Sequence, residues 1–411
     1  MPLPLYLLAV AVFAMGTSEF MLAGLLPAIA SDLGVTLGAA GTLTSAFAIG
    51  MVVGAPLTAV LARALPRRWS LLGALLLFTA AHTAGAAAPN LPLLLATRVV
   101  AALAAAGFLA VALTTAAALV PADRKGRALA VLLSGTTVAT VAGVPAGAAL
   151  GSALGWRAVF WAVAALCLPA ALGVLTGVPA GRPPRDAADR PTVRTELARL
   201  SSPRLLTVML LAALVNAATF TGLTYLAPVV TGTAGLDASW VPVTLVLFGA
   251  GSFAGVTAAG RLSDRHPVPV LATGGALLLA GWPALALLAT RPAALLALVF
   301  ALGALSFAVG GTLITRVLYA AAGAPTLAGA CATAALNLGA AAGPLAGARA
   351  LTTPAGDLGP VWLAALLTAL ALLLAAPLRT ALRAEPRDAG ADGRGNPSRT
   401  APAPEESPAS P

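Results

Sequence analysis

The sequence predicts an all-α membrane protein in which twelve transmembrane helices form two six-helix bundles. Of its 411 residues, 59% are hydrophobic and only 9% are charged, a composition outside the range of soluble globular domains. Apolar runs long enough to cross about 30 Å of hydrocarbon as helices recur along the chain. Landmarks of the first half also reappear about 200 residues later in the second half.

Twelve apolar runs can be counted. Helices are expected in each of them, because an isolated strand would leave its backbone groups unpaired in lipid. The predicted spans are residues 4–30, 39–62, 70–88, 92–119, 127–150, 156–178, 205–231, 240–261, 268–290, 293–319, 326–349 and 358–379. The polar segment after the sixth run divides the chain into an N-terminal bundle at 1–178, a cytoplasmic linker at 179–204, a C-terminal bundle at 205–380 and a disordered cytoplasmic tail at 381–411.

The two halves read as copies of one unit. Four landmarks recur in order at offsets of 199–201 residues: Phe20 with Phe220, Pro27 with Pro228, Gly54 with Gly255, and Pro145 with Pro344. A repeated six-span unit inserts twice with the same orientation. This is the arrangement of transporters that hold a site between two bundles.

Basic residues predict how the chain lies in the membrane. A net charge of +10 would suit nucleic acid as a partner, but the charges follow the topology instead. With the N-terminus inside, 19 of the 24 Lys and Arg residues fall in cytoplasmic segments. The positive-inside rule therefore predicts that both termini are cytoplasmic, and no nucleic acid is expected as a partner. The first run lacks a basic start and is predicted to be a span, not a signal peptide.

One carboxylate, Glu19, stands in the middle of the first run. An ionisable group at that depth costs about 2.5–3.5 kcal/mol on insertion scales, so such groups usually face a cavity or a partner. Helical spacing puts Met15 and Gly16 on the same face. Two interpretations stay open: a structural acid that snorkels or forms a salt bridge, or a proton-coupling group that loads and releases a proton during transport.

Arg98, in the fourth run, is the predicted partner of Glu19 in proton coupling. A rise of about 1.5 Å per residue puts the two residues at similar depths in the membrane. The alternative is an arginine that snorkels to the headgroups. The corresponding positions one repeat later are uncharged, so only the N-terminal bundle is expected to handle protons.

Further residues are candidates for the substrate cavity and for conformational change. The cavity candidates are Met15, Asn216, Thr219, Thr224 and Asn337. The two asparagines could equally join helices through hydrogen bonds. Small residues that allow close packing and a kink, and charges that can latch a helix end, form the conformational motifs. These are Gly143, Pro145 and Gly147 in the fifth run, and Gly260, Arg261, Asp264 and Arg265 after the eighth.

Signatures of other protein classes are missing from the sequence. It contains no His-Glu-x-x-His, no Gly-x-Ser-x-Gly and no Walker loop, so we expect neither an enzyme nor an ATP-driven pump. Cys167 and Cys331 lie in apolar runs and offer no metal spacing. The sequence contains only two histidines, His82 and His266, which are too few to favour a histidine-based zinc or proton site. No cofactor and no metal are expected.

Several of these stretches resemble the major facilitator superfamily and, within it, the twelve-span drug:proton antiporters. Residues 16–21 with 24–27 resemble the first-helix signature of a bacterial efflux group, residues 143–147 the fifth-helix antiporter motif, and residues 260–265 the cytoplasmic loop motif. Arg98 occupies the place of the fourth-helix arginine. Similarity to the chloramphenicol efflux branch rests on residues 44–51, 54–57, 110–115 and 128–135.

The resemblance implies proton-coupled efflux of a small drug, most closely chloramphenicol or related phenicols, by alternating access. It implies a monomer in the lipid bilayer of the bacterial inner membrane, with one proton on Glu19 returning for each neutral drug exported. The chain departs from the family at Arg63 and Pro66 in the first loop motif and at Ala101 and Ala102 in the fourth helix. The alternatives are a proton-coupled transporter of another solute, such as a sugar or metabolite, and a membrane receptor or scaffold.

Overall fold

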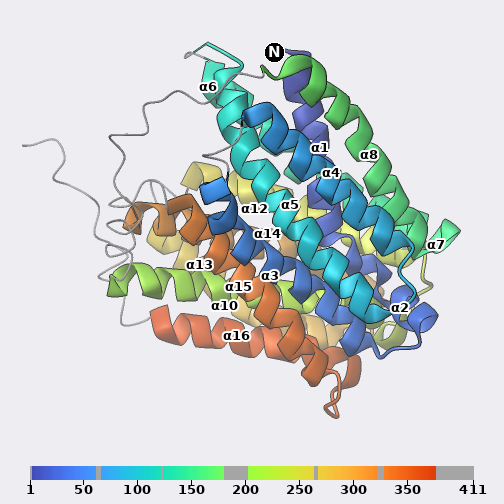
Figure 1. Ribbon diagram of the computed structural model, residues 1–411. Helices are drawn as coiled ribbons and strands as arrows, with labels where there is room; N and C mark the ends of the chain where they lie inside the picture. Colours follow the sequence, from blue (N-terminus) through green and yellow to red (C-terminus); the bar gives the residue numbers. More distant parts are fainter. Residues whose placement is uncertain are drawn as a thin grey trace, which may run out of the picture.

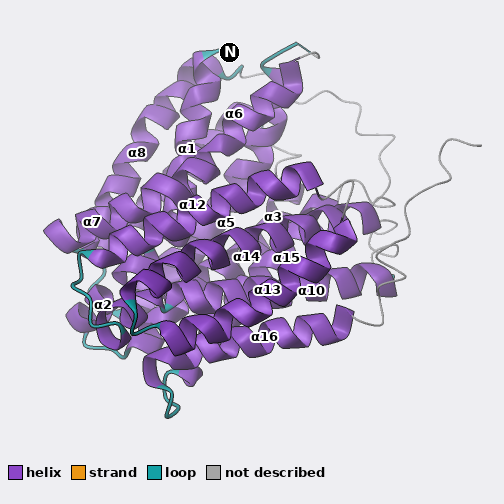
Figure 2. Cartoon of the chain, turned by 180° about the vertical axis from the view of Figure 1, so that it is seen from behind, coloured by secondary structure: helices purple, strands orange, loops and turns teal. Residues whose placement is uncertain are grey.

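The computed structural model describes residues 2–61, 66–121, 124–179, 202–262, 267–321 and 328–375, and these residues form a bundle of helices (Figure 1). Within those ranges no strand occurs, as Figure 2 shows from behind. Nearly all of the predicted linker and the whole predicted tail lie outside the described residues. The predicted domain boundaries therefore stay a prediction.

Six passes come from the first half of the chain. They are formed by α1 (Leu3–Phe20) with α2 (Leu22–Leu33), α3 (Leu37–Leu61), α4 (Arg67–Ala86), α5 (Leu91–Ala118), α6 (Lys125–Val138) with the π-helical η2 (Ala139–Gly143) and α7 (Val144–Leu154), and α8 (Trp156–Gly177). Asn90 caps α5 by accepting a hydrogen bond from the Leu93 backbone N–H at 3.0 Å.

Six further passes come from the second half. They are formed by α10 (Pro203–Thr224) with α11 (Leu226–Pro228) and the π-helical η3 (Val229–Thr233), α12 (Trp240–Leu262), α13 (Pro267–Leu288), α14 (Pro292–Ala320), α15 (Ala328–Ala350), and η4 (Gly356–Leu358) with α16 (Gly359–Ala375). Eleven segments of the described chain are long and apolar enough to span a membrane. The twelfth pass is α15, whose 23 residues are mostly Ala and Gly. The predicted twelve-span all-α architecture is confirmed.

The first pass is two helices and not the continuous run that the sequence suggests. Pro27 lies inside α2, where it has no N–H to donate and its ring crowds the preceding turn. The helix is interrupted at Met21, whose N–H donates to the Thr17 carbonyl at 2.8 Å. A helix leaves its last four carbonyls without partners in the helix. The break therefore frees the Ser18 carbonyl for another donor.

The buried apolar side chains form two large clusters, one built mainly from each half of the chain. The halves meet where α3 packs on α15, where α12 packs on α7 and η2, and where α2 packs on α10 and α11. Figure 1 shows the beginnings of α1 and α6 lying apart from the beginning of α10. The two bundles therefore converge near α2 and diverge toward the ends where α1, α6 and α10 begin.

Glycines allow close approach both inside and between the bundles. Some glycines pack inside their own bundle: a Cβ on Gly339 of α15 would lie 2.1 Å from the Ala213 carbonyl oxygen of α10. The glycines that face the other bundle are different ones. A Cβ on Gly41 would lie 2.1 Å from the Tyr225 hydroxyl, and one on Gly249 would lie 2.3 Å from the Thr140 carbonyl oxygen. Sequence alone did not separate these two groups.

Candidate functional site

Glu19 lies in the last turn of α1 and is partly exposed. It lines a pocket of about 360 Å³ of unfilled space on the N-terminal bundle, together with Val12, Met15, Gly16, Phe47, Met51, Ala105, Leu109 and Thr136. Met15 and Gly16 thus share its face, as helical spacing predicts. The other lining residues are almost all apolar, so the carboxylate is the one ionisable side chain among them.

Arg98 of α5 lies behind this pocket and is completely buried. Its two terminal nitrogens both donate to Ser18, one to the hydroxyl oxygen at 2.8 Å and one to the backbone carbonyl at 2.8 Å. The guanidinium also lies over the Phe47 ring, 4.4 Å from its centroid, a favourable cation–π geometry. Arg98 therefore lies at the depth of Glu19 and does not snorkel to the headgroups.

Glu19 and Arg98 are neighbours without being an ion pair. No N···O contact within 4.0 Å joins them in the part of the chain that the structure describes. The two side chains are nevertheless close, because Arg98 is hydrogen-bonded to Ser18, the residue next to Glu19. In this conformation the guanidinium is hydrogen-bonded to Ser18, and the Glu19 carboxylate faces the pocket.

Ser18 and His82 are the polar groups that sequence reasoning missed. His82 of α4 is buried, with Nε2 2.7 Å from the Ser18 hydroxyl and Nδ1 2.9 Å from the Phe78 carbonyl oxygen. A signal for it was present, because a lone histidine inside an apolar span must find a hydrogen-bond partner there.

Aromatic side chains gather where the two bundles meet. Phe20 and Phe220, the repeat-related pair, face each other across the interface with ring centroids 5.6 Å apart. Phe248 and Phe307 pack edge to face at 6.2 Å. A crevice of about 250 Å³ of unfilled space lies among Phe20, Thr140, Val144, Leu223, Leu245, Phe248 and Phe307. Residues of both bundles therefore line it.

The polar cavity candidates of the C-terminal bundle lie apart from the Glu19 pocket. Asn216 donates to the Leu336 carbonyl of α15 at 2.7 Å, which joins α10 to α15. Asn337 donates to the Thr333 carbonyl at 3.0 Å within its own helix. Thr219 and Thr224 are buried. For Asn216 the geometry favours the helix-joining alternative, and a role in substrate binding stays a prediction for the other three.

The conformational motifs fall partly inside the described chain. A Cβ on Gly143 would lie 2.2 Å from the Thr17 hydroxyl, so this glycine lets η2 approach α1 within one bundle. Pro145 follows directly in the first turn of α7 and is buried, as is Gly147. The second motif is described only in part: Gly260 and Arg261 are exposed at the end of α12, whereas Asp264 and Arg265 lie outside the described residues.

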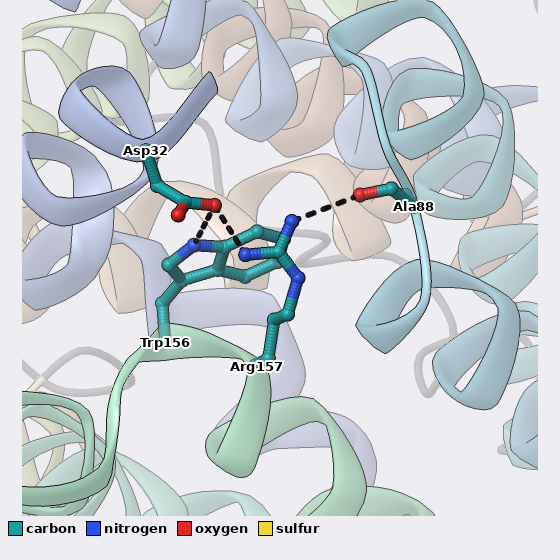
Figure 3. Close-up of polar contacts among 4 residues, drawn as sticks. All are labelled: Asp32, Ala88, Trp156 and Arg157. Carbon is teal, nitrogen blue, oxygen red and sulfur yellow. Dashed lines mark hydrogen bonds and ion pairs between the residues drawn. The ribbon is translucent and has the colours of Figure 1, made fainter. Parts of the chain in front are cut away.

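A second polar cluster joins three segments of the N-terminal half (Figure 3). Asp32, at the end of α2, accepts hydrogen bonds from Arg157 and from the Trp156 indole at 3.1 Å. Arg157 also donates to the Ala88 carbonyl at 3.2 Å and lies over the Trp156 ring. The cluster ties α2 to α8 and to the turn before α5, so these segments are held as one body.

Replacing Asp32 by Asn should lower thermal stability slightly, and the loss should depend on pH. Arg157 and Trp156 donate to the carboxylate and hold the pKa of Asp32 below its ordinary value of 3.8. A depressed pKa contributes stability above the unfolded value, and that contribution disappears as the pH falls through the folded value. The difference in melting temperature between wild type and Asp32→Asn, followed by tryptophan fluorescence in detergent, should therefore shrink below about pH 4. A constant difference down to pH 2 would contradict it.

Fold and site together define a multi-pass helical membrane protein with two packed bundles and a buried charge cluster in the first. The profile of the Major Facilitator Superfamily matches residues 8–329. A chloramphenicol resistance protein of Streptomyces lividans is 71% identical over 390 residues, covering 95% of this chain and 100% of that protein. The inner membrane transport protein YdhP of Escherichia coli K12 is 35% identical over 371 residues, covering 90% and 94%. The chain belongs to the Major Facilitator Superfamily.

Solved structures agree on the fold. A bacterial homologue of the human lysosomal transporter Spinster, in an inward-facing and unoccupied conformation, has a TM-score of 0.70 at 16% identity over 93% of this chain and 98% of that one. A mutant of the nucleoside transporter NupG has a TM-score of 0.72 at 14% identity, covering 93% and 99%. The family resemblance read from the motifs is confirmed by the profile match and by the Streptomyces lividans relative.

Proposed function

We propose that this protein exports a small drug, chloramphenicol or a related phenicol, from the bacterial cytoplasm in exchange for a proton. The observation that carries the proposal is one partly exposed carboxylate, Glu19, beside a buried arginine in a chain 71% identical to a chloramphenicol resistance protein. Ionisable groups inside membrane helices ordinarily serve transport or ion pathways. The protein acts as a monomer in the inner membrane with both termini cytoplasmic.

The arrangement of the bundles supports alternating access. They converge at α2, α7 and η2 and diverge where α1, α6 and α10 begin. With cytoplasmic termini, those divergent ends face the cytoplasm, so this conformation would load drug from inside. The aromatic crevice between Phe20, Phe248 and Phe307 suits the aromatic ring of a phenicol, since ring pairs add about 0.5–1.5 kcal/mol beyond burial.

The position of Glu19 supports proton coupling. The carboxylate lines the pocket, while Arg98 is occupied by Ser18. A proton can therefore reach Glu19 without first breaking an ion pair. When Arg98 approaches the carboxylate, or the drug donates a hydrogen bond to it, the charged form is favoured and the proton leaves. Competition between proton and drug in one conformational cycle couples the two fluxes.

The test is transport by the wild-type chain in inside-out vesicles. An imposed pH gradient, acid inside, should drive uptake of labelled chloramphenicol, and nigericin, which collapses that gradient, should abolish it. Expression should also lower the chloramphenicol susceptibility of a sensitive host. Unchanged susceptibility with no uptake would reject phenicols as the substrate. Uptake that ignores the gradient would reject proton coupling.

A further inference from the structure

His82 lies at the end of a hydrogen-bonded chain that runs through Ser18 to Arg98, and the proposed function does not yet use it. Its side chain is 1% exposed. It packs against the rings of Phe78 and Phe160, with centroids 4.1 and 5.7 Å away. The imidazole is thus held in one place beside Ser18.

The direction of each hydrogen bond in this chain follows from its partners. The Phe78 carbonyl can only accept, so His82 Nδ1 carries the hydrogen of the 2.9 Å bond. In a neutral imidazole Nε2 is then an acceptor, and the Ser18 hydroxyl donates to it at 2.7 Å. The Ser18 oxygen keeps its lone pairs for Arg98, which donates at 2.8 Å. All of these bonds are satisfied together by a single tautomer.

This hydrogen-bonded chain holds the Arg98 guanidinium in place. Both of its terminal nitrogens are taken by Ser18, and its Nε has no hydrogen-bond partner among the described residues. Ser18 and Glu19 are adjacent in the sequence, so they compete for one guanidinium. An acceptor that holds the Ser18 hydroxyl hydrogen turns this hydrogen away from the arginine. The hydrogen bond from Arg98 to the Ser18 oxygen is therefore strengthened relative to an ion pair with Glu19.

We propose that His82 is a positioning residue for proton coupling: by accepting the Ser18 hydroxyl hydrogen, it holds Arg98 on Ser18 and away from the Glu19 carboxylate. The inference rests on the proposed proton-coupled export and assigns the control of its charge pair. Without His82, Ser18 can turn its hydrogen toward Arg98, and the guanidinium is released to Glu19. The carboxylate would then stay paired and would load protons poorly.

The experiment compares coupled with uncoupled flux in vesicles. His82→Phe should reduce gradient-driven uptake of labelled chloramphenicol roughly tenfold, equivalent to about 1.4 kcal/mol, which is within the net range of one neutral hydrogen bond. Exchange of labelled for unlabelled drug, which needs no net proton movement, should stay near the wild-type rate. His82→Gln, whose amide oxygen can accept from Ser18, should restore gradient-driven uptake. Thr83→Val, a neighbouring half-buried residue that bonds only its own helix, is the matched control.

A double-mutant cycle isolates the route through Ser18. Ser18→Ala should impair coupling as His82→Phe does, Ser18→Thr should not, and His82→Phe should add no further loss once Ser18 is Ala. Wild-type coupling in His82→Phe, or equal loss of coupling and exchange without rescue by His82→Gln, would overturn the inference. Absence of gradient-driven uptake in the wild type would instead overturn the proposed function, so the two failures are distinct.

Discussion

Glu19→Gln is expected to abolish gradient-driven drug uptake, to the level of protein-free vesicles, while leaving drug exchange in place. The amide has nearly the shape of a protonated carboxyl group and fits the same pocket, so folding and insertion should be unchanged. It cannot release a proton, however, and the cycle loses its coupling step. Uptake driven by an acid vesicle interior and equilibrium exchange of labelled drug are measured on the same preparation.

The matched control for Glu19 removes a carboxylate that lies elsewhere. Asp237 is exposed, and its carboxylate accepts a hydrogen bond from the backbone N–H of Ser239 at 2.8 Å. Asp237→Asn should therefore transport as wild type does. Gradient-driven export by Glu19→Gln at matched expression would remove Glu19 from the mechanism. Loss of exchange together with export would show instead that the residue is needed for the fold or for drug binding.

Gly41→Leu is expected to stop export by preventing the bundles from closing near α2. The new Cβ would lie 2.1 Å from the Tyr225 hydroxyl, and that hydroxyl is itself fixed by a 2.8 Å bond to the Pro344 carbonyl oxygen. Overpacking of this kind costs about 1–3 kcal/mol. A cost of that size changes the ratio of closed to open states by roughly 5- to 150-fold.

Distances between spin labels measure this shift directly. Leu154 and Leu287 are exposed near the converging ends of the two bundles, and Leu172 and Leu373 are exposed near the diverging ends. In Gly41→Leu the first distance should lengthen and the second should shorten. Gly73→Leu, on α4 where a Cβ meets nothing within 4 Å, should change neither. Unchanged distances in Gly41→Leu would show that the interface is not a gate.

Composition and periodicity were sufficient for the membrane class, the twelve passes and the two halves. The thickness of the hydrocarbon core sets the length of every spanning helix, and its apolar character sets the composition. Each span can therefore be predicted from its own residues alone. The same logic singled out Glu19 and Arg98, because a charge inside an apolar run is conspicuous without any knowledge of its neighbours. The repeat offset also anticipated the element order, since α5 begins at residue 91 and α14 at residue 292.

Packing between distant helices decided the rest. The sequence predicts that Arg98 pairs with Glu19, but in the fold the guanidinium donates to Ser18. The reason is that the break after α1 leaves the Ser18 carbonyl without a partner in its own helix. No role for His82 is predicted from the sequence, because two histidines are too few for a histidine-based site. In the fold, His82 is the end of that hydrogen-bonded chain. Asn216 proves to join two helices. Hydrogen-bond partners depend on which helix faces reach each other, and that arrangement exists only once the twelve helices have packed.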